Sequence, residues 1–195
     1  GGKFVAIPTG TQYSSGNYYP PDYESFYSTD GVNWETGGET PSPDGGPSQT
    51  RWNCVIYGGG KYVAVGKDGE ELVKYSTDGL SWTYIKGGEN GVPSSDWMSV
   101  AYGNGRFVAV ADEGIIRAMT STDGITWTAL SIANNVKIKD FYGISYGNGM
   151  FMAVGMNYVM YSYDGLNWQQ TASGVGPNEW RMCAYGDDKW VAVAF

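Results

Sequence analysis

Short runs of alternating apolar and polar residues recur along this chain, and glycine-rich segments separate them. The clearest run, Trp97–Tyr102, has the period of two that is typical of a half-buried β-strand. The residues that follow, Gly103-Asn104-Gly105, accept a positive φ at low cost, so they predict a tight turn. A second strand is then expected from Arg106 to Val110.

The remainder of this unit predicts two more strands. The third strand is expected to end at Thr120-Ser121. Asp123-Gly124 is a strong hairpin signal and predicts the turn into a fourth strand, which carries Trp127 and runs to Leu130. Four short strands in roughly 40–45 residues are the size of one β-propeller blade.

The chain repeats this unit about four times. A first motif reads YSTDGVNW, YSTDGLSW, TSTDGITW and YSYDGLNW, ending at Trp34, Trp82, Trp127 and Trp168. A second motif reads YGGGKYVAV, YGNGRFVAV, YGNGMFMAV and YGDDKWVAV, starting at Tyr57, Tyr102, Tyr146 and Tyr185. Five residues before each of these tyrosines stands a large aromatic residue: Trp52, Trp97, Phe141 and Trp180. The opening GGKFVAI is a truncated fifth copy, so the repetition covers the whole chain.

A four-stranded antiparallel sheet cannot bury both of its faces alone, and stacking such sheets around an axis solves this. The sequence therefore predicts an all-β fold, a β-propeller or propeller segment of four-stranded antiparallel blades with about 4–5 blades represented. We expect a single domain over residues 1–195, with repeats at approximately 3–60, 61–105, 106–149, 150–188 and a partial copy at 189–195. The four strand-opening aromatic residues are expected to lie in the core between blades.

Both ends of the chain fall in the second strand of a repeat. One strand is thus represented twice, which leaves two possibilities. Either the two termini interleave in one closing blade, or the chain is part of a longer propeller. We favour the second possibility, because rings of four blades are rare.

The first motif resembles the Asp-box, or bacterial neuraminidase repeat, whose pattern is Ser/Thr-x-Asp-x-Gly-x-Thr-Trp in a hairpin between the outer strands of a blade. Here glycine follows aspartate directly, so the loop is one residue shorter. The resemblance implies a structural role, in which the carboxylate accepts backbone N–H groups of its own turn. The residues concerned are Ser28, Asp30, Gly31, Trp34, Ser76, Asp78, Gly79, Trp82, Ser121, Asp123, Gly124, Trp127, Ser162, Asp164, Gly165 and Trp168. One Asp and one Ser per turn do not supply the six or more oxygens of a calcium site, so no metal or cofactor is expected.

Composition narrows the possible functions. The chain has 30 Gly among 195 residues, a formal net charge of -8 and no His. An acidic surface disfavours nucleic-acid binding, and the absence of His removes the commonest general base and metal ligand. No apolar run is long enough to suggest membrane insertion. Strand alternation places Cys54 and Cys183 on opposite sheet faces, which argues against a disulfide between them.

A sialidase activity, which the resemblance raises, would use three arginines to hold the substrate carboxylate. The chain has four arginines: Arg51, Arg106, Arg117 and Arg181. Arg106 occupies a position that holds Lys or Met in the other copies, and no triad emerges. We therefore expect no enzymatic activity. The acidic stretch Asp68-Gly69-Glu70-Glu71 is expected to be a solvated loop.

A binding function is favoured by the connections between strands. In a propeller, the loops that enter each blade and those between its second and third strands share one end, and their lengths vary here. The first copy carries the longest insert, with Tyr13, Tyr18, Tyr19 and Tyr23 among Ser, Gly and Asn, a composition suited to contact surfaces. This insert could bind a neighbouring protein, bind a glycan, or only cover the edge of its own blade.

The sequence thus indicates a non-catalytic structural or binding propeller. We expect it to belong to a virion or cell-surface assembly, such as a phage tail, fibre or capsid-decorating protein, because the repeats look most like those of phage and bacterial surface proteins. Its expected partners are protein subunits of that assembly, surface glycans, or both, and its expected location is extracellular or on a virion surface. The alternative is a secreted carbohydrate-binding or sialidase-like glycoside hydrolase propeller.

Overall fold

The computed structural model describes residues 2–8, 12–14, 17–19, 25–37, 50–131, 140–171 and 178–194, and these residues form strands and turns. Sheet 1 contains β1 (Phe4–Ala6), β4 (Phe26–Ser28) and β5 (Glu35–Thr36). Sheet 2 contains β6 (Arg51–Gly58), β7 (Lys61–Lys67), β8 (Glu71–Ser76) and β9 (Thr83–Lys86). Sheet 3 contains β10 (Asp96–Gly103), β11 (Arg106–Glu113), β12 (Ala118–Ser121) and β13 (Thr128–Leu130).

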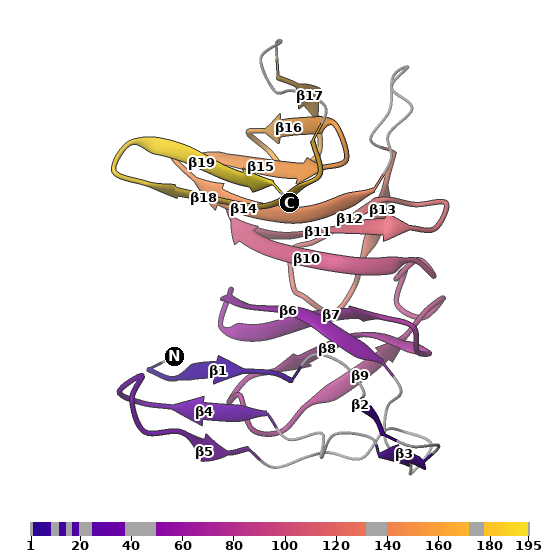
Figure 1. Ribbon diagram of the computed structural model, residues 1–195, viewed down its shortest axis with the longest axis vertical. Helices are drawn as coiled ribbons and strands as arrows, with labels where there is room; N and C mark the ends of the chain where they lie inside the picture. The colour runs from indigo at the N-terminus through magenta and orange to yellow at the C-terminus, as the bar shows by residue number, and fades with distance from the viewer. Residues whose placement is uncertain are drawn as a thin grey trace.

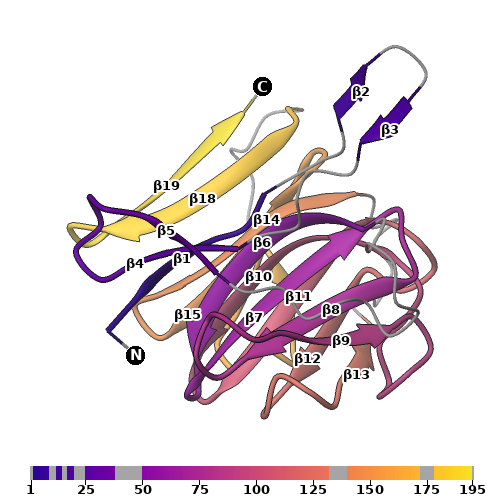
Figure 2. The ribbon, with the colours of Figure 1, turned by 90° about the horizontal axis from the view of Figure 1, so that it is seen from below.

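Sheet 4 contains β14 (Phe141–Gly147), β15 (Met150–Gly155), β16 (Tyr158–Ser162) and β17 (Gln169–Gln170), and sheet 5 contains β18 (Trp180–Gly186) and β19 (Lys189–Ala194). Strands pair antiparallel with their neighbours in sequence order within each sheet. The sheets stack in chain order, with sheet 1 at the bottom and sheet 5 near the top (Figure 1). A separate hairpin of β2 (Gln12–Ser14) and β3 (Asn17–Tyr19) extends away from the stack (Figure 2). The all-β fold of four-stranded antiparallel sheets predicted from the repeats is confirmed.

Two details of the prediction need correction. Trp127 precedes the fourth strand of its sheet and is not part of it, because β13 begins at Thr128. The expected solvated loop at residues 68–71 ends early, since Glu71 is buried and opens β8. The expected repeats run from a second strand to the next first strand, so they group the same strands differently from the sheets. Each repeat holds the last three strands of one sheet and the first strand of the next.

The ends of the chain do not share a sheet. β1 pairs with β4, whereas β18 pairs with β19. The interleaving of termini in one closing blade, which was one of two possibilities, is therefore not what the structure shows. The first strand of sheet 1, β1, corresponds to the second strand of a complete sheet. Among the described residues, sheet 5 contains only the counterparts of a first and a second strand.

Each pair of neighbouring sheets is joined by the same two apolar faces. The second strand of the preceding sheet presents two aliphatic residues, such as Val63 and Val65 of β7, which we call the aliphatic face. The following sheet presents the strand-opening aromatic residue, the aromatic residue of its second strand and its motif tryptophan, which we call the aromatic face. In sheet 3 these are Trp97, Phe107 and Trp127, all buried against sheet 2. Burying one valine side chain contributes roughly 1.5–3 kcal/mol, so each junction is a substantial part of the core.

The same arrangement recurs at the other junctions. Val5 and Ile7 of sheet 1 pack on the cluster of Trp52, Tyr62 and Trp82 in sheet 2. Val108 and Val110 of sheet 3 pack with Phe141 and Phe151 of sheet 4. Val154 and Met152 of sheet 4 pack with Trp180 and Trp190 of sheet 5. The expectation that the strand-opening aromatic residues lie between blades is confirmed.

Close approach of the inner strands depends on glycine at one repeated position. A Cβ atom added to Gly103 of β10 would lie 2.1 Å from Cγ of Tyr146, which belongs to the first strand of sheet 4. Gly58 and Gly147 have the same relation to Tyr102 and Tyr185. Because each tyrosine ring lies directly on the glycine of the preceding sheet, the first strands β6, β10, β14 and β18 lie side by side.

The turn between the third and fourth strands is held by a serine and an aspartate. Ser121 Oγ accepts the N–H of Gly124 at 2.8 Å and donates to Asp123 Oδ1 at 2.9 Å. The same carboxylate oxygen accepts the N–H groups of Ile125 and Thr126, both at 2.8 Å. Equivalent bonds are present at Asp30, Asp78 and Asp164. Each turn therefore satisfies its own backbone donors without help from other strands.

These bonds favour the ionised carboxylate. The backbone N–H groups of Asn33, Ser81 and Asn167 lower the pKa of Asp30, Asp78 and Asp164 respectively. At Asp123 burial opposes the effect, but the N–H groups of Thr126 and Ile125 outweigh it and the pKa is also lowered.

Substitution at the inner glycines tests the junction geometry. We expect Gly103→Ala to lower the free energy of unfolding by roughly 1–3 kcal/mol, because the new Cβ must displace the Tyr146 ring. Gly186→Ala is the matched control, since among the described residues no atom lies within 4 Å of the Cβ position there. Urea unfolding of both variants measures the difference. Equal effects at the two positions would contradict the packing of the Tyr146 ring on Gly103.

Acid should weaken the Ser-x-Asp-Gly turns. Because the pKa of Asp164 is depressed in the folded state, its carboxylate stabilises the fold above about pH 4, the usual pKa of an unfolded aspartate, and this stabilisation is lost as the pH falls further. Asp164→Asn should lower stability at neutral pH by roughly 0.5–1 kcal/mol, the difference between a charged and a neutral acceptor. The deficit should shrink in acid. Asp187→Asn, which removes a fully exposed carboxylate, should show no such pH-dependent deficit. If urea titrations show that Asp164→Asn lowers the free energy of unfolding equally at all pH values, the stabilising role of the ionised Asp164 carboxylate is contradicted.

Candidate functional site

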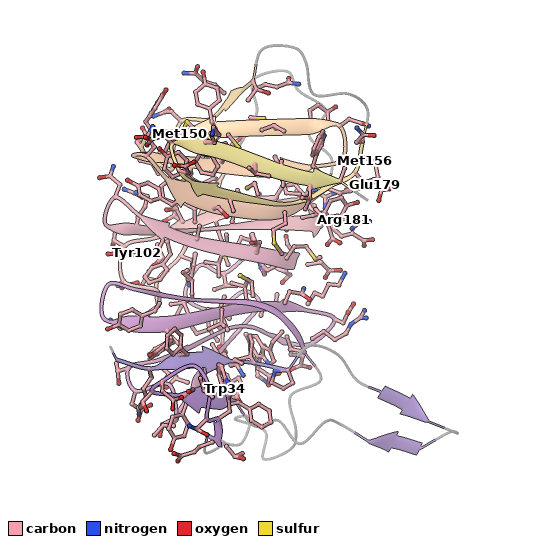
Figure 3. The ribbon with its side chains drawn as sticks, turned by 60° about the vertical axis from the view of Figure 1, so that its left-hand side comes forward. Trp34, Tyr102, Met150, Met156, Glu179 and Arg181 are labelled. Atoms are coloured by element: carbon pink, nitrogen blue, oxygen red, sulfur yellow. The ribbon has the colours of Figure 1, made fainter. Side chains whose placement is uncertain are left out.

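The strands of the stacked sheets begin and end at two opposite edges of the stack, and the connections at these two edges differ. The turns between first and second strands and the Ser-x-Asp-Gly turns lie at one end, the turn face, where Tyr102 and Met150 are seen in Figure 3. The connections that enter each sheet, and those between second and third strands, lie at the other end. This is the loop face, where Met156, Glu179 and Arg181 are seen. The β2–β3 hairpin projects on the loop-face side (Figure 3). Connections at the loop face differ in length between sheets, whereas those at the turn face are nearly uniform.

Each first strand carries a β-bulge close to the loop face. In sheet 2, Trp52 pairs with Gly66 and Cys54 pairs with Val65, so Asn53 is an extra residue without a cross-strand partner. The same shift makes Met98 the extra residue of β10, Tyr142 that of β14 and Arg181 that of β18. A bulge re-aims its side chain and recurs next to binding and active sites. Four neighbouring inner strands therefore each present one bulge residue, and the four residues are chemically different.

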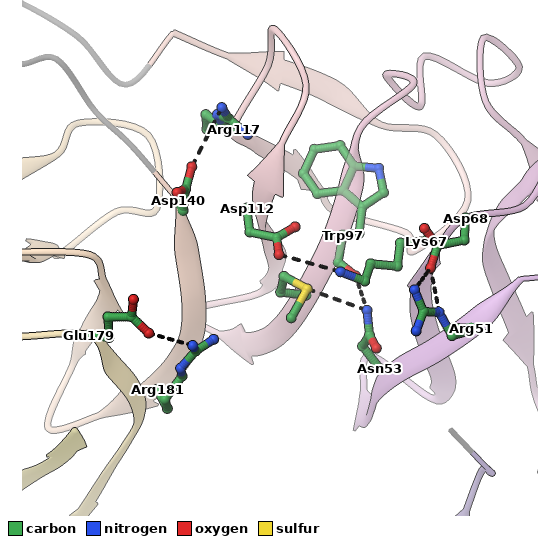
Figure 4. Close-up of polar contacts among 11 residues, drawn as sticks. Arg51, Asn53, Lys67, Asp68, Trp97, Asp112, Arg117, Asp140, Glu179 and Arg181 are labelled. Carbon is green, nitrogen blue, oxygen red and sulfur yellow. Dashed lines mark hydrogen bonds and ion pairs between the residues drawn. The ribbon is translucent and has the colours of Figure 1, made fainter. Parts of the chain in front are cut away.

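The bulge residues interact in pairs across sheet boundaries. Asn53 Nδ2 donates to the carbonyl oxygen of Trp97 at 2.9 Å and lies 3.5 Å from the sulfur of Met98 (Figure 4). The Arg181 guanidinium lies 4.0 Å from the centre of the Tyr142 ring, a cation–π contact. We call Asn53, Met98, Tyr142 and Arg181 the bulge row.

Ion pairs surround the bulge row. Lys67 of sheet 2 reaches Asp112 of sheet 3 at 3.4 Å. Arg117 of sheet 3 reaches Asp140, which precedes β14, at 3.7 Å. Within single sheets, Arg51 pairs with Asp68 and Arg181 pairs with Glu179 (Figure 4). The loop face is thus a mixed-charge surface on which two ion pairs bridge consecutive sheets and two half-exposed pairs do not.

Two charged groups in this region have a buried atom without a partner among the described residues. They are Asp112 Oδ1, an acceptor, and Arg117 Nη1, a donor. A buried polar atom without a partner is costly, which is why such atoms are uncommon. Both atoms are shielded from solvent, so they belong to the packed layer beneath the loop face.

Two acidic groups at the loop face have a raised pKa. Burial raises the pKa of Asp96, and the neighbouring carboxylate of Asp68 raises it further against the opposing effect of Lys67. Burial also raises the pKa of Tyr142, although the Arg181 cation opposes this. The tyrosine is therefore a neutral hydrogen-bonding group at physiological pH.

The tyrosines predicted to bind a partner fall at the edge of what the structure describes. Tyr13 lies in β2, and Tyr18 and Tyr19 lie in β3, but their side chains are outside the described residues. Tyr23 is also outside them. Binding through these four residues stays a prediction, and the position of the hairpin on the loop-face side is compatible with it.

The arginines considered for a sialidase site are distributed among several contacts. Arg106 opens β11 at the turn face and donates to Thr120 Oγ1 at 3.1 Å. Arg51, Arg117 and Arg181 lie at the loop face in three different sheets, and each pairs with a carboxylate. The described geometry thus gives no clamp of three free arginines.

The other groups considered from the sequence are the two cysteines and possible metal ligands. Cys54 and Cys183 are free thiols, in β6 and β18, and burial raises the pKa of Cys183 to about 11. Within the described ranges, no three His, Cys, Asp or Glu side chains gather as metal ligands would. A search of the same ranges for a helix long and apolar enough to cross a membrane gave none.

Sequence reasoning missed the bulge row, although a signal was present. The residue after each strand-opening aromatic differs in every copy, Asn53, Met98, Tyr142 and Arg181, while the aromatic before it and the Tyr-Gly pair after it hardly change. A position that varies among the copies is a candidate for function, and the next position, which holds Cys54, Ser99, Gly143 and Met182, varies as much.

Comparison with solved structures places the fold among β-propellers. The structure described as YCF48 bound to D1 peptide superposes with a TM-score of 0.60 at 17% sequence identity, over 100% of this chain and 64% of that one. YCF48 from Cyanidioschyzon merolae gives a TM-score of 0.55 at 16% identity, over 95% of this chain and 63% of that one. The chain thus spans less than two thirds of the length of these YCF48 structures.

A proposed glycoside hydrolase from Parabacteroides distasonis gives a TM-score of 0.50 at 14% identity, over 99% of this chain and 80% of that one. Identities this low show a shared fold alone. None of the curated proteins compared with the chain matches it in sequence. The sequence profile of the DUF6242 beta propeller domain, however, matches residues 28–179, which include the three complete sheets, and the chain therefore belongs to the DUF6242 beta-propeller family.

Proposed function

We propose that this chain is a non-catalytic propeller that binds a protein partner through its loop face. The observation that carries the proposal is the bulge row, in which four chemically different side chains without cross-strand partners follow one another across neighbouring inner strands. An aligned row of different side chains on a rigid scaffold is suited to recognising an extended polypeptide.

The comparison with YCF48 also supports a protein partner, because that propeller is described as bound to a peptide. We further propose that the first motif is a shortened Asp-box, since its serine and aspartate bind the backbone of their own turn. In keeping with the repeats, we place the chain in a larger assembly on a virion or a cell surface. The tyrosines of the β2–β3 insert would widen the contact surface.

The second candidate function is carbohydrate binding or sialidase-like hydrolysis. It rests on the structural similarity to the proposed glycoside hydrolase. The pairing of Arg51, Arg117 and Arg181 with carboxylates weighs against it, because a sialidase needs its arginines for the substrate.

A random linear peptide library displayed on phage tests the proposal. Peptides selected on the immobilised chain should lose at least about tenfold in affinity for Tyr142→Ala and for Arg181→Ala, the loss expected when an interface anchor is removed. Tyr18→Ala with Tyr19→Ala should weaken binding as well if the insert contributes. Tyr163→Ala, at an exposed position of the turn face, should bind as the unmodified chain does.

Failure to select any peptide, or peptides insensitive to both bulge substitutions, would contradict the proposal. A glycan array and a fluorogenic sialoside distinguish the second candidate function, carbohydrate binding or hydrolysis, from peptide binding. Turnover of the sialoside that is abolished by Arg117→Met would establish hydrolysis and overturn the assignment as a binder.

A further inference from the structure

The apolar faces at the junctions do not by themselves distinguish one junction from another. Every junction joins aliphatic residues of one sheet to aromatic residues of the next. During folding, the aliphatic face of one sheet can therefore meet the aromatic face of a sheet that is not its neighbour, most simply one in a second chain. Misassembly of this kind is a characteristic failure of repeat proteins. A chain of similar sheets thus needs a further feature that selects the correct neighbour.

The junction of sheets 1 and 2, the two lowest sheets in Figure 1, contains hydrogen bonds that cross between the sheets. Ser25, which precedes β4, accepts the indole N–H of Trp82 through its Oγ at 3.1 Å. The same hydroxyl donates to the carbonyl oxygen of Gly79 at 3.4 Å. Tyr62 of β7 donates its hydroxyl to the carbonyl oxygen of Lys3 at 2.8 Å. One hydroxyl from each of the two sheets therefore bonds to the other sheet.

The serine distinguishes sheet 1 from the three sheets that follow it. At the position of Ser25, three residues before the motif serine, sheets 2, 3 and 4 have Val73, Ala118 and Val159. These side chains accept no hydrogen bond. Accordingly, the indole N–H groups of Trp127 and Trp168 have no partner among the described residues. Another sheet docked on sheet 2 would remove the acceptor that the buried Trp82 uses, and such a loss is costly.

The tyrosine hydroxyl distinguishes sheet 2 in the same way. At the position of Tyr62 in the second strand, the other sheets have Phe4, Phe107, Phe151 and Trp190. Tyr62, Phe107 and Phe151 are all buried, so the hydroxyl is the main difference between the three complete sheets at this position. If sheet 1 docked on sheet 3 or sheet 4, the carbonyl oxygen of Lys3 would lose its donor, because phenylalanine has none.

We propose that Ser25 and Tyr62 select the correct neighbours, so that sheet 1 stacks on sheet 2 in preference to every other sheet. Ser25 makes sheet 1 the best partner for sheet 2, and Tyr62 makes sheet 2 the best partner for sheet 1. A wrong pairing keeps apolar contacts of the same kind but loses at least one of these bonds, and specificity depends on such a difference. Both hydroxyls lie in a junction and not in the bulge row, so the inference does not depend on the proposed function.

Removal of both hydroxyls tests the inference. Ser25→Ala combined with Tyr62→Phe installs the residue types that sheet 3 holds at these positions, and it leaves the apolar contacts in place. The double variant and the unmodified chain are unfolded in urea and refolded at a series of chain concentrations. Each sample is then diluted to one low concentration, at which reversible complexes dissociate, and size exclusion with light scattering measures the chains that stay in larger species. This trapped fraction should be at least about fivefold larger for the double variant, the factor that two lost hydrogen bonds correspond to.

Met160→Ala is the matched control for stability. It removes buried side-chain volume at the junction of sheets 3 and 4, so it lowers the free energy of unfolding without changing either hydroxyl. Its trapped fraction should stay at the level of the unmodified chain. The single variants Ser25→Ala and Tyr62→Phe should each show an intermediate increase.

Three outcomes overturn the inference. A double variant that refolds as the unmodified chain does would show that the two hydroxyls do not select neighbours. An equal increase for Met160→Ala would assign the trapped species to lower stability. A double variant that does not fold would assign both hydroxyls to stability alone.

Discussion

The contact between the aliphatic face of one sheet and the aromatic face of the next is the interaction on which the remaining structure depends. A single four-stranded sheet has no second layer of its own, so Val63 or Trp127 would be exposed without its neighbour. Glycine at the end of each first strand lets the tyrosine of the next sheet approach its backbone. The resulting alignment of inner strands brings Asn53 to Met98 and Arg181 to Tyr142, residues that are far apart in sequence.

Constant and variable positions have separate roles in this arrangement. The strand-opening aromatic, the second-strand apolar residues and the Ser-x-Asp-Gly turn recur because each satisfies the same junction or the same turn. The bulge residue is released from that requirement, since it has no cross-strand partner. It differs from sheet to sheet, and the loops that end beside it differ in length. Recognition on such a scaffold changes while the core stays fixed.

Much of the fold could be predicted from the sequence, because its determinants are local and repeated. Alternation, the Asn104-Gly105 turn and the Asp123-Gly124 hairpin signal placed the strands to within a few residues. The start of the fourth strand was misplaced at Trp127, because an aromatic residue that closes a turn has the same composition as a strand residue. The burial of Glu71 escaped prediction, since charge indicated a loop and the sheet register decided otherwise.

The site was harder to predict than the fold. A bulge adds one residue to a strand, and hydrophobic periodicity does not reveal it over so short a run. The ion pairs of Lys67 with Asp112 and of Arg117 with Asp140 join different sheets, so their partners depend on how the sheets stack. The tyrosine-rich insert, by contrast, was visible in composition, and its side chains lie outside the described residues.

A double-mutant cycle across one junction tests the central claim most directly. Val108 of sheet 3 and Phe151 of sheet 4 are both buried in one cluster, and Gly165 lies against both of them. The free energies of unfolding of Val108→Ala, Phe151→Leu and the double variant, measured in urea, should be non-additive by at least about 0.5 kcal/mol, as is usual for residues in contact. Strictly additive effects would contradict the stacking of aliphatic and aromatic faces.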